Sequence, residues 1–179
     1  MKKLYYITGV PGSGKSSVLR ELQTRGYEAH GVDEEGFADW HNKATGSIDV
    51  RPEDQTEEQQ HQWFGDHDWT LNRDRIAALK LEVEPSLKNV VFLCGVAGGE
   101  KEVWDLFDGV FALIIDAETL KKRISNRTDN HFGKSEDELN LILSGHATYE
   151  TDYKGFGATI IDATQPINIV TDEILCELQ

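Results

Sequence analysis

The sequence predicts a three-layer α/β fold, in which helices cover both faces of a parallel sheet. Two observations indicate this fold. Five short β-branched or aromatic runs alternate with helix-like segments, and a glycine-rich loop stands between the first run and the first helix-like segment. The chain of 179 residues suits one domain, spanning 1–179. The runs expected to be strands are 4–8, 28–32, 90–94, 110–115 and 158–161.

Helix signals fill most of the connections between these runs. The first helix is expected over residues 16–25, where Gly26 follows as a C-terminal stop. The pattern Ser135-Glu136-Asp137-Glu138 predicts the capped start of a later helix. The last helix should begin at Pro166, whose fixed φ suits a first turn, and end near Leu178.

Residues 36–87 form an insertion that exceeds a minimal connection between the second and third strands, and we expect it to build an acceptor site. Residues 57–83 read as helical, with Thr56 and Gln59 as a capping pair. Three tryptophans of the insertion either line a pocket or pack against other apolar groups: Trp40, Trp63 and Trp69.

A complete phosphate-binding loop, G-x-x-x-x-G-K-S, occupies residues 9–16. Its glycines let backbone N–H groups face a phosphate, and the following helix presents its positive end to the same anion. Lys15 is expected to reach the β and γ phosphates, and the Ser16 hydroxyl to ligate Mg²⁺. The predicted nucleotide contacts in this loop are Gly9, Pro11, Gly12, Ser13, Gly14, Lys15, Ser16 and Ser17.

With this loop, the pair Arg73 and Arg75, and the segment 123–134, the chain resembles the small P-loop kinases, the group of nucleoside monophosphate, shikimate and gluconate kinases. The resemblance implies a five-stranded parallel sheet in the order 2-3-1-4-5, with ATP and Mg²⁺ bound. Asp33 matches an acidic position near Mg²⁺ and the acceptor hydroxyl. Arg73 and Arg75 match positions where the group often places an arginine that binds the acceptor or a phosphate.

The resemblance also implies two further contacts with the nucleotide. Arg123 and Arg127 lie four residues apart, so a helix places both on one face, where they either meet the transferring phosphoryl group or form a solvated basic patch. Residues 127–135 would be a short lid, hinged near Gly133 and contributing Lys134. The segment after the last strand resembles the loop that packs on adenine, through Ala163, Gln165 and Pro166.

The third strand ends in Leu93-Cys94-Gly95 without the aspartate of a standard Walker B motif. Ser16 and Asp33 are therefore the expected metal ligands, with Asp116 as an alternative acid. The resulting hypothesis is an ATP-dependent phosphotransferase acting on a metabolite, nucleoside or nucleotide, with Asp33 orienting the acceptor. The alternatives are an ATP-binding regulatory protein and a nucleotide hydrolase.

The amino-acid composition and net charge limit the classes of molecule that the protein is expected to bind. A net charge of −14 and a pI near 4.7 disfavour binding to nucleic acid polymers or acidic membranes. Twelve of the acidic residues fall within 28–68, against Lys43 and Arg51. We expect a cytoplasmic monomer or homodimer with a small-molecule acceptor, and Cys94 and Cys176 as reduced core thiols.

Overall fold

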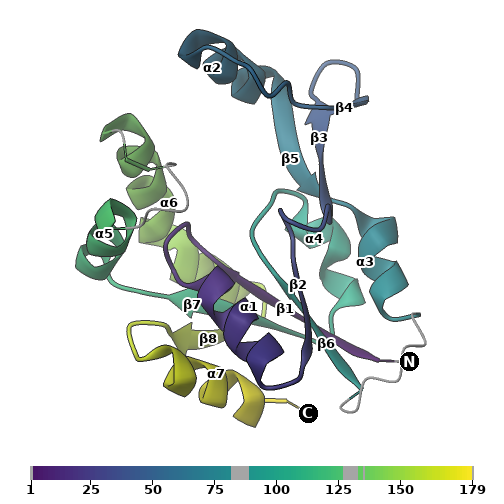
Figure 1. The fold of residues 1–179 in the computed structure, drawn as a ribbon, viewed down its shortest axis with the longest axis vertical. Coiled ribbons are helices and arrows are strands. Elements are labelled where there is room, and N and C mark those ends of the chain that lie inside the picture. Colours follow the sequence, from purple (N-terminus) through teal and green to yellow (C-terminus); the bar gives the residue numbers. More distant parts are fainter. Residues whose placement is uncertain (1, 82–88, 127–132, 135, 179) are drawn as a thin grey trace.

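The computed structural model describes residues 2–81, 89–126, 133–134 and 136–178. Five parallel strands form its main sheet, in the spatial order β2-β6-β1-β7-β8 (Figure 1). Counted along the chain within this sheet, the order is 2-3-1-4-5, as predicted. The strands are β1 (Lys3–Gly9), β2 (Glu28–Gly31), β6 (Val90–Cys94), β7 (Gly109–Ile114) and β8 (Thr159–Asp162).

The central strand β1 is buried on both faces, which explains why it reads as a continuous apolar run. Tyr5 and Ile7 belong to the core on one face, whereas Leu4 and Tyr6 belong to the core on the other. This alternation follows the two-residue period of a strand. Thr8 is the next residue whose side chain lies on the same face as that of Tyr6, and it directly precedes the phosphate-binding loop.

Helices cover both faces of the sheet, which confirms the predicted three layers. The helices α1 (Lys15–Thr24) and α7 (Ile167–Cys176) contact each other and share the core of Tyr5, while α3 (Arg73–Leu79) and α4 (Glu100–Val103) share the core of Tyr6. Outside the insertion, the other described helices are α5 (Ala117–Asn126), α6 (Glu136–Gly155) and a short 3₁₀ helix, Trp104–Leu106.

The insertion forms a second, antiparallel sheet in the order β4-β3-β5, which projects from the main sheet at the top of Figure 1. Its strands are β3 (Ala38–Asn42), β4 (Ile48–Asp49) and β5 (His67–Leu71). The helix α2 (Glu57–Asp66) begins with the predicted capping box of Thr56 and Gln59. The prediction of one helix over 57–83 was wrong, because residues 67–71 pair with β3 instead.

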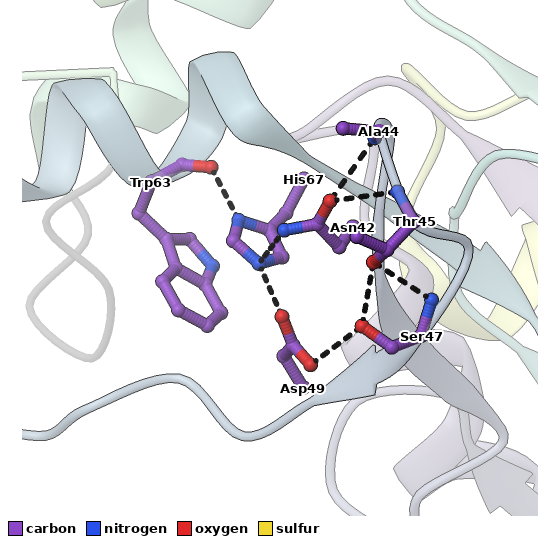
Figure 2. A network of polar contacts seen from close by, with 7 residues as sticks. All are labelled: Asn42, Ala44, Thr45, Ser47, Asp49, Trp63 and His67. Atoms are coloured by element: carbon purple, nitrogen blue, oxygen red, sulfur yellow. Dashed lines mark hydrogen bonds and ion pairs between the residues drawn. The ribbon is translucent and has the colours of Figure 1, made fainter.

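A buried histidine joins the parts of this insertion (Figure 2). His67 Nδ1 donates to the carbonyl oxygen of Trp63 at 3.1 Å, and Nε2 lies 3.0 Å from a carboxylate oxygen of Asp49. The imidazole also stacks on the Trp63 ring, with centroids 3.7 Å apart. His67 therefore links the end of α2 to β4 and the start of β5.

The two cysteines differ in exposure. Cys94 is buried at the end of β6, as predicted, but Cys176 is exposed at the end of α7, so its assignment to the core was wrong. Among the described residues, the helices are too short or too polar to cross a membrane.

Candidate active site

The phosphate-binding loop follows β1 directly and leads into α1. Gly14 is the N-cap of α1, with φ 108°, and it has no side chain that could cap the helix. An anion can therefore occupy the place of a capping group and meet the N–H groups and the positive end of the helix dipole. The Lys15 ammonium is held over the loop by the carbonyl oxygens of Gly9 and Val10.

At two glycines of the loop, neighbouring atoms lie so close to the backbone that an added side chain would clash with them. Gly12 has φ 89°, and a Cβ there would lie 3.1 Å from both Leu120 and Ile124 of α5. A Cβ on Gly9 would lie 2.4 Å from the Ser13 hydroxyl oxygen. That hydroxyl is buried without a hydrogen-bond partner, and the added Cβ would also lie 3.0 Å from the backbone oxygen of Leu113.

A cleft of about 780 Å³ opens in front of this loop. It brings together the loop, the start of α1, the segment after β2, β5 of the insertion, α5 and the segment after β8. The predicted nucleotide and acceptor residues that line it are Pro11, Gly12, Ser13, Gly14, Lys15, Ser16, Ser17, Asp33, Arg123, Ala163 and Gln165. Gly9 and Pro166 lie beside the lining residues rather than among them.

Arg123 connects two separate segments that line the cleft. Its guanidinium donates to the carbonyl oxygen of Ser13 at 3.1 Å and to that of Ala163 at 2.8 Å. It thus joins the phosphate-binding loop to the segment that the resemblance places beside adenine. The side chain comes from α5, whose buried Leu120 and Ile124 fix the helix against the core.

Asp33 lies at the opposite end of the cleft, where the main sheet meets the insertion. The indole Nε1–H of Trp69 donates to its carboxylate at 3.1 Å. The side chain opens onto the cleft, yet the surrounding protein desolvates it, which raises the pKa of Asp33 despite the Trp69 hydrogen bond. Its carboxylate is therefore a stronger base than that of an ordinary aspartate.

Backbone contacts hold Trp69 in this position. The amide of Gly98 donates to the Trp69 carbonyl at 2.7 Å, and the Gly98 carbonyl accepts from Leu71 at 3.0 Å. A Cβ on Gly98 would lie 3.2 Å from the Trp69 oxygen, so glycine is needed where β5 docks on the segment after β6. Sequence analysis singled out Trp69 but did not connect it to Asp33.

The remaining predicted acceptor residues are already paired. Arg73 forms a two-pronged ion pair with Asp105, with both N–O distances 2.6 Å, and Arg75 contacts Asp39 at 2.9 Å and the Gly36 carbonyl. Neither arginine is among the residues that line the cleft. Their role in acceptor binding stays a prediction.

The lid region is only partly covered by the structure. Arg127 lies outside the described residues, as do 128–132 and 135. Gly133 is buried, has φ 92°, and packs against Ile124 and Ile142, whereas Lys134 is exposed. The lid stays a prediction.

The oxygen ligands expected for Mg²⁺ fit the cleft. The Ser16 hydroxyl and the Asp33 carboxylate both line it, and hydroxyl and carboxylate oxygens are the donors that Mg²⁺ takes. Asp116 instead caps α5 by accepting hydrogen bonds from the Thr119 amide and hydroxyl, both at 2.7 Å. Within the described part of the chain, no group of three or more metal-binding side chains comes together elsewhere.

A partly buried carboxylate behind the loop was not predicted from the sequence. Glu100, at the start of α4, accepts hydrogen bonds from Tyr6 at 2.9 Å, from Thr8 at 3.1 Å and from Tyr153. Thr8 also contacts the hydroxyl of Tyr149 at 3.0 Å. Because Thr8 precedes Gly9, this network anchors the start of the phosphate-binding loop to α4 and α6. Local sequence carries no signal for this network.

Comparison with known proteins agrees with this geometry. A family model described as an AAA domain (AAA_18) matches residues 6–143, and the chain belongs to this family. No curated protein matches the sequence.

Solved structures identify the fold as that of a small P-loop kinase. A sugar kinase from a Janibacter species has a TM-score of 0.56 at 18% identity, covering 98% of this chain and 94% of that chain. A gluconokinase from Sinorhizobium meliloti has a TM-score of 0.53 at 20% identity, covering 98% and 90%. A deoxyadenosine kinase from M. mycoides with bound dATP has a TM-score of 0.52 at 17% identity, covering 99% and 98%.

Proposed function

We propose that the protein is an ATP-dependent phosphotransferase that moves the γ-phosphoryl group to a hydroxyl of a small molecule. The observation that carries this proposal is the shared cleft, where the phosphate-binding loop and Asp33 line one cavity of about 780 Å³. A phosphate donor and an acceptor can meet there. Structural neighbours named as sugar, gluconate and deoxyadenosine kinases support the same reaction class.

In this proposal, the chain supplies positioning and charge. The loop amides and Lys15 hold the β and γ phosphates, and Arg123 neutralises charge that develops during transfer. Asp33 orients the acceptor hydroxyl and takes its proton as the acceptor oxygen bonds to the γ phosphorus. The bond from that phosphorus to the bridging oxygen breaks, and ADP leaves.

Ser16 and Asp33 are the side chains proposed to hold Mg²⁺. When bound, Mg²⁺ neutralises phosphate charge and helps to align the transferring group. Ala163, Gln165 and Pro166 are proposed to border the base, and Arg127 to join Arg123 at the phosphates. The acidic surface and the cleft also support a cytoplasmic protein whose partner is a small molecule.

The test is ADP formation with and without candidate acceptors, in the wild type and in Lys15→Met. We expect formation of ADP and a phosphorylated product to be strongly stimulated by one class of acceptor and to be abolished in the variant. Phosphate release that is independent of any acceptor would instead make the protein a hydrolase. Tight ATP binding without transfer or hydrolysis would make it a nucleotide-dependent regulator.

A further inference from the structure

Charged side chains are segregated along the cleft. Its described lysine and arginine side chains, Lys15, Arg20 and Arg123, belong to the phosphate-binding loop, α1 and α5. At the end that faces the insertion, the lining groups are Asp33, Glu34, Trp69 and Val96. An acceptor that binds beside Asp33 therefore meets two carboxylates, an indole and an aliphatic side chain.

The arginines nearest in sequence to this end are engaged by other acids. Arg75 is held by Asp39, which also accepts from Asn72 at 2.6 Å. Arg73 forms an exposed ion pair with Asp105 and also donates to the Glu102 carbonyl. Recruiting Arg75 to an anionic acceptor would take a partner from the shielded carboxylate of Asp39, which lowers the gain from the new contact.

The second carboxylate, that of Glu34, packs against a glycine at the end of β2. A Cβ on Gly31 would lie 2.1 Å from a Glu34 carboxylate oxygen, so Glu34 folds over the bare backbone of a glycine. The neighbouring Glu35 also lies at Gly31, accepting from the Gly31 amide at 3.0 Å and contacting His30 at 2.7 Å. Of the two glutamates, Glu34 is the one that lines the cleft.

The indole of Trp69 adds a flat apolar surface to the same end. Trp40 packs against this indole, with ring centroids 5.0 Å apart. The hydrogen bond to Asp33 fixes the orientation of the Trp69 ring. Flat aromatic faces suit the carbon face of a ring or a positively charged group. Carboxylates beside such a face accept hydrogen bonds from hydroxyl or amino groups.

We infer that the acceptor is a hydroxylated compound without a phosphate or carboxylate, either neutral or cationic, that stacks on Trp69 and hydrogen-bonds to Asp33 and Glu34. This inference rests on the proposed function and defines its substrate class. An anionic acceptor would be repelled by the two carboxylates.

The first experiment compares acceptors that share a skeleton and differ in charge. The sugar series is glucose, glucosamine, gluconate and glucose 6-phosphate, and the nucleoside series is adenosine with AMP and deoxyadenosine with dAMP. Transfer from ATP is quantified by the phosphorylated product, and ADP formation without acceptor is measured in parallel. In at least one series, we expect kcat/KM for the neutral or amino member to exceed that for the anionic members by about tenfold or more.

The outcomes separate the two proposals. Faster transfer to gluconate, glucose 6-phosphate or a nucleoside monophosphate than to the matched uncharged compound would overturn the substrate class and leave the phosphotransferase intact. Transfer to no member of either series would contradict both. A higher kcat/KM for glucosamine than for glucose would identify the cationic form of the class, and the reverse would identify the neutral form.

Variants test the residues that carry the inference. Glu34→Lys should raise kcat/KM for anionic relative to neutral acceptors, whereas Glu58→Lys, the same charge change on the exposed side of α2, should leave the ratio unchanged. Trp69→Leu should raise the acceptor KM about tenfold without changing the ATP KM, and Trp69→Phe should restore most of the affinity. An unchanged acceptor preference in Glu34→Lys would contradict the inference.

Discussion

Arg123 places its guanidinium 3.1 Å from the carbonyl oxygen of Ser13, and so ties α5 to the phosphate-binding loop. The same group reaches the Ala163 carbonyl at 2.8 Å. A lysine has one nitrogen and cannot span both acceptors with the fork of a guanidinium. Arg123 therefore links the phosphate-binding loop to the segment after β8.

Arg123→Lys should raise the KM for ATP and lower kcat, with kcat/KM falling about tenfold to a hundredfold. Lys122→Ala, a change at the exposed neighbouring position, is the control and should keep kcat/KM within about twofold of the wild type. Steady-state kinetics with ATP as the varied substrate gives both values. Equal behaviour of the two variants would remove Arg123 from the proposed site.

Gly12→Ala should disrupt both the loop and its packing on α5. The residue has φ 89°, and the added Cβ would lie 3.1 Å from Leu120 and Ile124. Gly26→Ala is the matched control, because Gly26 has φ 75° and nothing lies within 4 Å of an added Cβ. We expect about 1–2 kcal/mol of destabilisation from backbone strain alone in Gly26→Ala, and a larger loss in Gly12→Ala. Urea unfolding of both variants measures the difference, and equal losses would contradict the close packing.

Glu100→Ala should destabilise the protein by about 2–4 kcal/mol, because the hydroxyls of Tyr6, Thr8 and Tyr153 lose their acceptor. Glu102→Ala, two residues along on an exposed position, should change the free energy of unfolding by less than about 0.5 kcal/mol. Chemical denaturation compares the two. A small effect at Glu100 would mean that water replaces the carboxylate in this network.

The contribution of Glu100 should also depend on pH in a defined direction. Desolvation raises the pKa of Glu100 above its usual value of 4.5, although the three hydroxyl donors oppose this rise. A raised pKa in the folded state means that folding favours the protonated acid. The stabilisation is therefore full below the unfolded pKa and is lost as the pH rises through the folded pKa.

Glu100→Gln provides the reference for this measurement, because glutamine resembles the protonated acid and does not titrate. The free energy of unfolding of the wild type, minus that of Glu100→Gln, should fall over the pH range that extends upward from the usual glutamate pKa value of 4.5. Urea titrations across this range give the difference. A difference that rises with pH would reverse the sign assigned to the Glu100 pKa.

The sequence was sufficient for the parts of the fold that depend on local pattern. Apolar runs predicted the five strands of the main sheet, and the loop at 9–16 was correctly placed between the first strand and the start of α1. The Thr56 capping box was also correct, because its hydrogen bonds join residues three apart. These features depend only on residues that are close together in the sequence.

Features that depend on distant residues were not predictable in the same way. Residues 67–71 were predicted to be part of a helix. They form the strand β5 because they pair with β3, which lies nearly thirty residues earlier in the chain. The contact of Trp69 with Asp33 spans 36 residues, and that of Thr8 with Glu100 spans 92. Such pairs become visible only when the topology has brought their elements together.

Calorimetric titration of the protein with ATP in the presence of Mg²⁺ tests the central claim most directly. We predict saturable binding of one ATP per chain in the wild type, and a large loss of affinity in Lys15→Met, whose fold should remain intact by circular dichroism. Absence of binding to the folded wild type, or equal affinity in Lys15→Met, would contradict the assignment of a nucleotide site to the loop at 9–16.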